Sequence, residues 1–281
     1  MSYLICVDSG HGMATAGKRT PPIPESWFGK KKGDIIHEKE FNKPAAEYLI
    51  AALTRCGFKT INVSPGTNDI PLVDRYTLAN KSKADLYISK HYNASTGKWG
   101  SANGIETIIS QYAGADSKRF ANLVHEELVK THKRTDRGVK TDIVQSGINL
   151  AVLRNANMPA ILTESGFMDN LAEAKTMLDP DFQRADAEAC CRGICKYFNV
   201  PYITDYIPAG TINVNSDSEA VKWLQNKLNK ANTGYTIPVT GKYDFSTKIS
   251  VLEYAKNMGW NWMQATGLSV GQGTINALAK L

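Results

Sequence analysis

Along the first 200 residues, short apolar runs alternate with stretches in which apolar residues recur every three or four positions. Runs of this length are typical of buried strands, and the second spacing is typical of amphipathic helices. The predicted strands span residues 3–8, 58–63, 85–90, 104–110 and 160–164, and the predicted helices span residues 38–56, 72–81, 117–130 and 182–198. Strands that alternate with helices predict an α/β fold, here an open, twisted, mixed sheet with helices on both faces.

The pattern changes at residue 200. Residues 200–211 contain two prolines and a glycine without periodicity, which is typical of a linker. Apolar residues then return at helical spacing in residues 217–229 and 246–258, and a short final helix follows. The chain is therefore predicted to hold two domains, residues 1–199 and residues 212–281, of which the second is a small three-helix domain.

Composition and charge argue against a nucleic-acid-binding protein and against a membrane-spanning one. The formal net charge of +6 is too mild for a nucleic-acid binder, and no apolar run approaches the roughly 20 residues of a membrane-spanning helix. The N-terminus has no basic start before its apolar stretch and reaches Asp8 at once, so we expect synthesis in the cytoplasm without a signal peptide. The five cysteines include no C-x-x-C pair, which predicts reduced, mostly buried thiols and neither a disulfide framework nor a cysteine-bound zinc.

Four polar residues stand at predicted strand ends or at a helix start. His11, His91 and Glu164 follow strands, and Glu38 begins the first helix. In open α/β sheets, ligands bind outside the carboxyl ends of the strands, where three of these residues are expected. Two neutral imidazoles and one carboxylate make a three-ligand zinc site whose fourth position stays open to water, and a second carboxylate can accept that water's proton. The pattern is thus compatible with metal-assisted hydrolysis.

Four segments resemble the motifs of the type-3 zinc-dependent N-acetylmuramoyl-L-alanine amidases, a family that includes many phage endolysins. The segments are Val7–Gly12, His37–Asn42, Ile88–Ala94 and Pro159–Phe167. They follow one another in the family's order, and the resemblance covers approximately residues 3–198. Four motifs in order are far more specific than any one of them. The residues beside the histidine of the third motif are larger or more polar than is common in the family.

The resemblance implies a role for each matching residue. His11, Glu38 and His91 would bind one Zn²⁺ per chain, and Glu164 would act as the catalytic base. Asn93, close to the second zinc histidine, is a candidate hydrogen-bond donor to substrate near the metal. The bond cleaved by this family joins the lactyl group of N-acetylmuramic acid to L-alanine in bacterial peptidoglycan.

The last part of the chain resembles the type-1 peptidoglycan-binding fold, a small three-helix domain. The matching stretches are residues 221–228, 238–244 and 271–278. Trp223, at helical spacing, is expected in the core of this domain. Trp260 and Trp262 lie in a polar stretch and are candidates for stacking on the sugar rings of the wall.

These resemblances imply a biological setting as well as a reaction. The expected partner is peptidoglycan, in particular the wall of a Gram-positive host. An enzyme made in the cytoplasm would act at the wall after release, either as an endolysin or in the lysis of a mother cell. The alternative enzyme is a zinc peptidase that cuts stem or cross-bridge peptides, and the alternative from another class is a protein that binds the wall without catalysis.

Structural roles are the alternative for each candidate ligand, such as a cap, a turn or a buried pair. The remaining histidines, His37, His125 and His132, are expected at the surface. Gly12–Lys18 fits the start of a phosphate-binding loop. However, Arg19 stands where the magnesium-binding Ser or Thr belongs, and the two prolines that follow exclude the helix that would hold the phosphates.

Overall fold

The computed structural model describes residues 3–204, 211–216, 218–234, 236–260, 267–279 and 281. It divides into two compact units, residues 1–203 and residues 204–281. The division lies inside the stretch predicted as a linker. Among the described residues, no helix combines the length and the apolar character that crossing a membrane requires.

The first unit is built on a six-stranded sheet with the strand order β2-β1-β3-β6-β4-β5. The strands are β1 (Leu4–Ser9), β2 (Lys59–Asn62), β3 (Leu86–Asn93), β4 (Ile105–Ile109), β5 (Asp136–Thr141) and β6 (Ala160–Phe167). Neighbouring strands are parallel except β4 and β6, which run antiparallel, so the sheet is mixed as predicted. The carboxyl ends of β1, β3 and β6 therefore meet at one edge, where the candidate residues lie.

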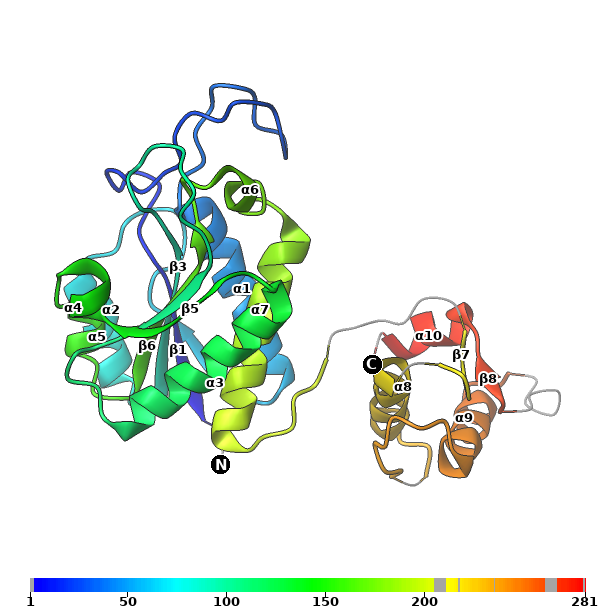
Figure 1. Cartoon of the computed structure of the whole chain (residues 1–281). Coiled ribbons are helices and arrows are strands. Elements are labelled where there is room, and N and C mark those ends of the chain that lie inside the picture. Colours follow the sequence, from blue (N-terminus) through cyan, green and yellow to red (C-terminus); the bar gives the residue numbers. More distant parts are fainter. Residues whose placement is uncertain (1–2, 205–210, 217, 235, 261–266, 280) are drawn as a thin grey trace. The chain divides into compact units, whose positions relative to one another are not determined.

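Helices cover both faces of the sheet, which confirms the predicted α/β architecture (Figure 1). One face packs against α1 (Lys39–Arg55), α3 (Ala115–His132) and α7 (Pro180–Phe198), whose apolar sides bury side chains such as Phe120 and Ile194 against the strands. The opposite face is covered by α2 and α5. The other helices of this unit are α2 (Leu72–Lys81), α4 (Asp142–Ser146), α5 (Ala151–Arg154) and α6 (Leu171–Ala174).

The structure differs from the predicted elements around the candidate site and at one edge of the sheet, and it adds the short helices α4, α5 and α6. The strands β3 and β6 extend through Asn93 and Phe167, so His91 and Glu164 lie inside strands and not after them. The edge strand β5 was not predicted, because its charged, half-exposed sequence lacks an apolar run. The prediction that His125 and His132 are surface residues is also wrong. His125 accepts or donates hydrogen bonds with Thr107 and Asp136, and the side chain of His132 is 4% exposed.

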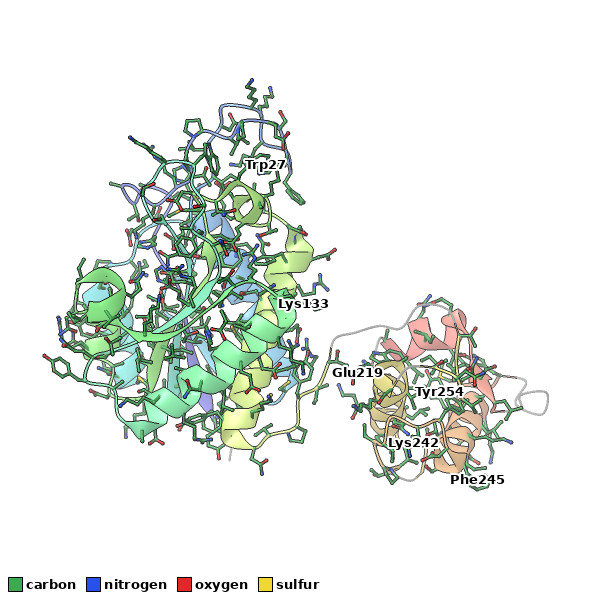
Figure 2. All side chains as sticks on the ribbon, in the orientation of Figure 1. Trp27, Lys133, Glu219, Lys242, Phe245 and Tyr254 are labelled. Atoms are coloured by element: carbon green, nitrogen blue, oxygen red, sulfur yellow. The ribbon has the colours of Figure 1, made fainter. Side chains whose placement is uncertain are left out.

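The second unit holds three helices and a two-stranded ribbon among its described residues. These are β7 (Ile212–Asn213), α8 (Ser218–Lys230), α9 (Phe245–Asn257), β8 (Ser269–Val270) and α10 (Gln272–Ala279). Its core contains Trp223, which confirms the prediction made from its helical spacing. Phe245, which Figure 2 labels at the start of α9, is 75% exposed. The domain is thus a small helical body with its own core.

Candidate metal centre

The fold brings His11, Glu38 and His91 together from three different elements. His11 follows β1, Glu38 caps α1, and His91 lies near the end of β3. One donor atom from each residue lies within 4.8 Å of the others. Nε2 of His11 is 3.4 Å from Oε2 of Glu38, and Nδ1 of His91 is 2.9 Å from Oε1 of Glu38. Two imidazoles and one carboxylate are a donor set typical of catalytic zinc.

Glu38 is buried and held by neighbours on its own helix and on β3. Its Oε1 accepts hydrogen bonds from Nδ2 of Asn42 at 3.0 Å and from the backbone N–H of Tyr92 at 3.1 Å. Burial opposes its ionisation, but His11 and His91 outweigh burial and hold the pKa of the Glu38 carboxyl below its usual value. Glu38 is therefore a fixed carboxylate before any ligand arrives.

His91 is oriented by a chain of hydrogen bonds that ends on a buried acid. Its Nε2 lies 3.0 Å from Oγ of Ser89, and the Ser89 hydroxyl donates to Oδ2 of Asp8 at 2.8 Å. Because the Ser89 proton goes to Asp8, its oxygen accepts the Nε2–H of His91. Nδ1 then keeps its lone pair and faces Glu38. A histidine that binds a metal through one nitrogen and donates the other to a polar partner shows this arrangement.

Gly10 leaves room for the His91 ring. A Cβ built on Gly10 would lie 2.6 Å from Nδ1 of His91 and nearer still to Cε1 and Nε2. His11, the next residue, has a φ of 59°, a left-handed conformation that histidine adopts more readily than most side chains. Its ring meets that of His91 edge to face, with centroids 4.8 Å apart. Burial lowers the pKa of His11 to about 4, so its imidazole is neutral at neutral pH.

Glu164 lies beside the three candidate ligands without belonging to their cluster. In the register of the sheet, it pairs with His91 on the neighbouring parallel strand. Its Oε2 is buried and has no hydrogen-bond partner among the described residues. Burial and the negative charge of Glu38 raise the pKa of the Glu164 carboxyl well above its usual value. A carboxyl whose pKa is raised in this way holds a proton more readily than an exposed one, which suits a group that transfers protons.

The residues fit a cation. Nδ1 of His91 and Oε1 of Glu38 are two lone-pair acceptors only 2.9 Å apart, so either a second ring proton or a cation must lie between the imidazole and the carboxylate. A cation would also offset the repulsion between the buried carboxylates of Glu38 and Glu164. Nitrogen and carboxylate donors together favour a transition metal over Mg²⁺ or Ca²⁺.

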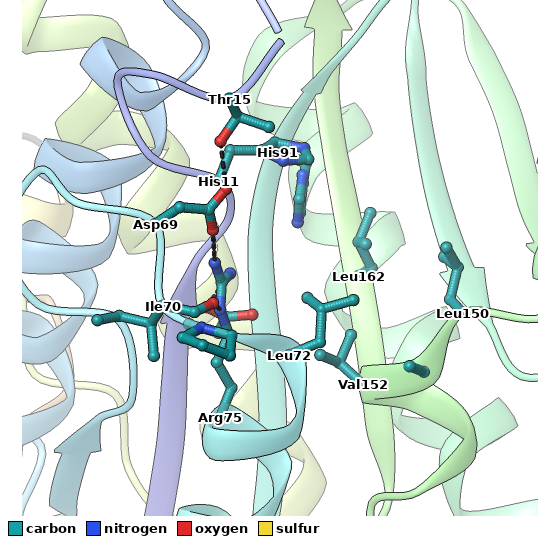
Figure 3. Close-up of a pocket in the computed structure, with 13 residues that line it drawn as sticks. His11, Thr15, Asp69, Ile70, Leu72, Arg75, His91, Leu150, Val152 and Leu162 are labelled. Carbon is teal, nitrogen blue, oxygen red and sulfur yellow. Dashed lines mark hydrogen bonds and ion pairs between the residues drawn. The ribbon is translucent and has the colours of Figure 1, made fainter.

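A cleft of about 480 Å³ opens beside these residues, and Figure 3 shows its walls. His11 and His91 line one side, and apolar side chains line much of the rest. The loop that carries Asp69 is fastened by Arg75, whose guanidinium donates to Asp69 at 2.7 Å and to Asp8 at 3.0 Å. The same buried acid thus anchors a wall of the cleft and, through Ser89, the His91 ring.

The other candidates stand apart from this cluster. Asn93 is 8% exposed, and its side-chain oxygen accepts a hydrogen bond from the N–H of Ala94, so its contact with substrate stays a prediction. Trp260, in the second unit, is 38% exposed and packs edge to face on Tyr254, with centroids 5.7 Å apart. Trp262 lies outside the described residues.

Asp8 and Ser89 were not singled out from the sequence. Asp8 belongs to the first motif, three positions before His11, and it follows four apolar residues in β1. A carboxylate buried at the end of an apolar run needs hydrogen-bond partners, and this requirement could have identified Asp8 from the sequence. Its connection to Ser89 arises because the two residues are paired across the parallel strands β1 and β3.

Sequence comparison with known proteins identifies the family of the chain. A family model described as N-acetylmuramoyl-L-alanine amidase (Amidase_3) matches residues 5–196. The endolysin of Bacillus phage SPP1 is 32% identical over 205 residues, which cover 71% of this chain and 68% of that protein. The N-acetylmuramoyl-L-alanine amidase CwlM of Bacillus licheniformis is 29% identical over 196 residues, which cover 70% and 69%.

Solved structures give the same result. The N-acetylmuramoyl-L-alanine amidase from Clostridium difficile 630 is similar with a TM-score of 0.59 and 31% identity, over 70% of this chain and 97% of that one. The catalytic domain of CwlV, an N-acetylmuramoyl-L-alanine amidase from Paenibacillus polymyxa var. colistinus, is similar with a TM-score of 0.59 and 29% identity. The similarity covers 71% of this chain and 99% of that one. This chain therefore belongs to the N-acetylmuramoyl-L-alanine amidase family.

Proposed function

We propose that the chain uses one zinc ion, held by His11, Glu38 and His91, to hydrolyse the amide bond between N-acetylmuramic acid and L-alanine in peptidoglycan. The assignment of the reaction rests on membership of the amidase family. The observation that supports the metal is the convergence of these three donor residues, each from a different element, beside an open cleft. Three protein ligands leave the fourth position of a catalytic zinc site free.

When bound, zinc polarises the scissile carbonyl and lowers the pKa of a water molecule to about 7. Glu164 is assigned the proton transfer: its carboxylate accepts a proton from the attacking water and returns it to the leaving amine of L-alanine. Its unpartnered Oε2 supports this role, because no hydrogen bond from the described residues competes for that oxygen. Glu38 and the hydrogen-bonded His91 hold their donor atoms in place, and the apolar side of the cleft orients the peptide stem.

The second unit is proposed to hold the enzyme on the wall. Its three described helices around a small core support a binding module. The candidates for contact with sugar rings stay Trp260 and Trp262, to which the exposed Phe245 is added. The proposed partner is peptidoglycan of a Gram-positive wall. The proposed setting is endolysin-like lysis after release from the cytoplasm, in keeping with the similarity to a phage endolysin.

The products of wall digestion test the reaction. Amidase action frees the α-amino group of L-alanine and creates no new reducing sugar ends, so the glycan strands should stay long and lose their peptides. Mass spectrometry of the fragments identifies the new ends. New amino groups on glycine, lysine or diaminopimelate would assign the chain to the zinc peptidases instead.

Glu164→Gln tests the assigned base. The substitution preserves shape but removes the ability to accept a proton, so the rate should fall by roughly 10²–10⁴. Zinc content should remain near one per proposed active site, because Glu164 is not a ligand. Loss of zinc would make Glu164 a ligand, and near-normal activity would place the base elsewhere. Binding to intact walls, which is assigned to the second unit, is the internal control.

A further inference from the structure

Three of the five cysteines converge at the end of the first unit that lies away from the candidate metal centre. Cys56 caps the C-terminus of α1, and Cys191 and Cys195 lie one turn apart on α7. Their sulfur atoms all lie within 4.8 Å of one another, and the three residues are 6%, 0% and 2% exposed. Sequence spacing did not predict this cluster, because 135 residues separate Cys56 from Cys191.

The geometry matches a thiolate metal site. Zinc–sulfur bonds are about 2.3 Å long, so two sulfurs on one tetrahedral zinc lie about 3.8 Å apart. Sγ of Cys56 and Sγ of Cys191 are 3.7 Å apart. Cys191 and Cys195 are four residues apart on a helix and therefore point to the same side. Three convergent sulfurs also exceed what one disulfide would use.

A second, independent observation comes from the chain after α7. The backbone N–H of Ile203 donates to Sγ of Cys56 at 3.2 Å, a type of bond that thiolate ligands commonly accept. The carbonyl oxygen of Ile203 lies 3.7 Å from the same sulfur, so an oxygen donor stands beside the three thiols. Nε of Arg55 donates to this carbonyl at 2.6 Å, which also brings a positive charge close to Cys56. A nearby cation favours thiolates over thiols.

The other two cysteines provide the contrast. Cys6 packs in the core on the opposite face of the sheet, and Sγ of Cys190 accepts a hydrogen bond from Nζ of Lys90 at 3.2 Å. Neither belongs to a group of metal-binding side chains among the described residues. The chain thus buries two isolated cysteines as small core residues and gathers the other three.

We propose that Cys56, Cys191 and Cys195 form a second metal site, which binds a thiophilic cation such as Zn²⁺. The site joins α1, α7 and the segment around Ile203, so its metal would fasten the end of the first unit to two of its helices. The 17 residues of α1 separate it from Glu38, a length of about 26 Å at 1.5 Å per residue. The site is structural, and it is independent of the proposed active-site zinc.

Cobalt and cadmium test the site directly, because thiolate bonds to these ions give sulfur-to-metal charge-transfer absorption that histidine and carboxylate ligands do not give. The full chain is reduced with a non-thiol phosphine, stripped of metal and titrated with Co²⁺ or Cd²⁺. The thiolate band should reach its end point between one and two ions per chain, because the candidate active site also takes up metal. It should persist in Glu38→Gln, which damages the candidate active site, and it should be lost in Cys56→Ala.

Cys190→Ala is the matched control, because it removes an equally buried thiol outside the cluster and should keep the band. If Cys56→Ala does not fold, the wild-type titration decides alone. The proposal is wrong if the wild-type chain gives no thiolate band with either ion while its circular dichroism shows that it is folded. Mass loss of two hydrogens before reduction, together with no thiolate band after it, would mean a disulfide and would overturn the proposal as well.

Discussion

Gly10→Ala places a methyl group where the His91 ring now lies. The added Cβ would be 2.6 Å from Nδ1, at least about 0.8 Å short of the 3.4 Å at which ordinary contact begins, and closer to two other ring atoms. The ring cannot turn away freely, because Ser89 and Glu38 hold its two nitrogens at 3.0 and 2.9 Å. The side chain of His91 must therefore shift away from its present position as a whole.

A shift of that size is large compared with what a metal site tolerates. Metal–ligand distances hold to about 0.2 Å, so a displaced Nδ1 no longer coordinates well. Changes in groups that merely orient a ligand cost about 10–100-fold in metal affinity or activity, and Gly10→Ala should cost at least as much. The overpacking itself should destabilise the first unit by about 1–3 kcal/mol, which leaves a folded protein to measure.

Zinc affinity by competition with a chromophoric chelator is the assay, with hydrolysis of soluble muropeptides measured in parallel. Gly114→Ala is the matched control, because its Cβ would point into open space and its φ is −74°. The control should behave as wild type in both assays. If Gly10→Ala binds zinc and cleaves substrate as well as Gly114→Ala does, the proposed coordination by His91 is wrong.

Three further predictions concern other residues. Glu38→Gln should lower the zinc content, whereas Glu40→Gln should not, because Glu40 accepts a hydrogen bond from the backbone of His37 and pairs with Lys30; equal zinc in both proteins would reassign the acid. Lys90→Met leaves Asp186 buried without its partner at 2.7 Å and should destabilise the first unit by about 3–5 kcal/mol in chemical unfolding, and a loss below 1 kcal/mol would contradict the pairing. Burial raises the pKa of the Asp186 carboxyl, but Lys90 and, after it, His132 outweigh burial and hold that pKa below its usual value. The stability from the Lys90 pair should therefore be present above about pH 4 and lost as pH falls further, and acid unfolding that is unchanged in Lys90→Met would refute this.

The long helices and the buried strands could be predicted from the sequence because they keep their apolar spacing, whereas the short helices α4, α5 and α6, of four or five residues each, are too short to show it. The predicted helix at residues 72–81 coincides with α2, for example. The strand β5 could not be predicted in this way, since half-exposed edge residues such as Arg137 and Lys140 interrupt any apolar pattern. The predicted strands also ended too early at β3 and β6. A strand that lines a site carries polar residues there, and these interrupt the apolar run from which the strand is predicted.

The site was predictable only in part for a related reason. His11, Glu38, His91 and Glu164 stand in recognisable motifs, whereas the bond from Ser89 to Asp8 depends on strand register. Register is set by the pairing of two segments 81 residues apart, and neither segment specifies it alone. The cysteine cluster depends in the same way on how α1 packs against α7.

The unequal exposure of the three candidate ligands has a kinetic consequence. The side chains of Glu38 and His91 are 2% and 11% exposed and are held by hydrogen bonds, whereas that of His11 is 20% exposed and stands on a loop. Glu38 and His91 are thus the two fixed donors, and His11 is the one that would close the site around an ion. Release would run in reverse, with His11 leaving first. Substitutions that loosen the loop around His11 should therefore speed metal exchange more than they weaken binding at equilibrium.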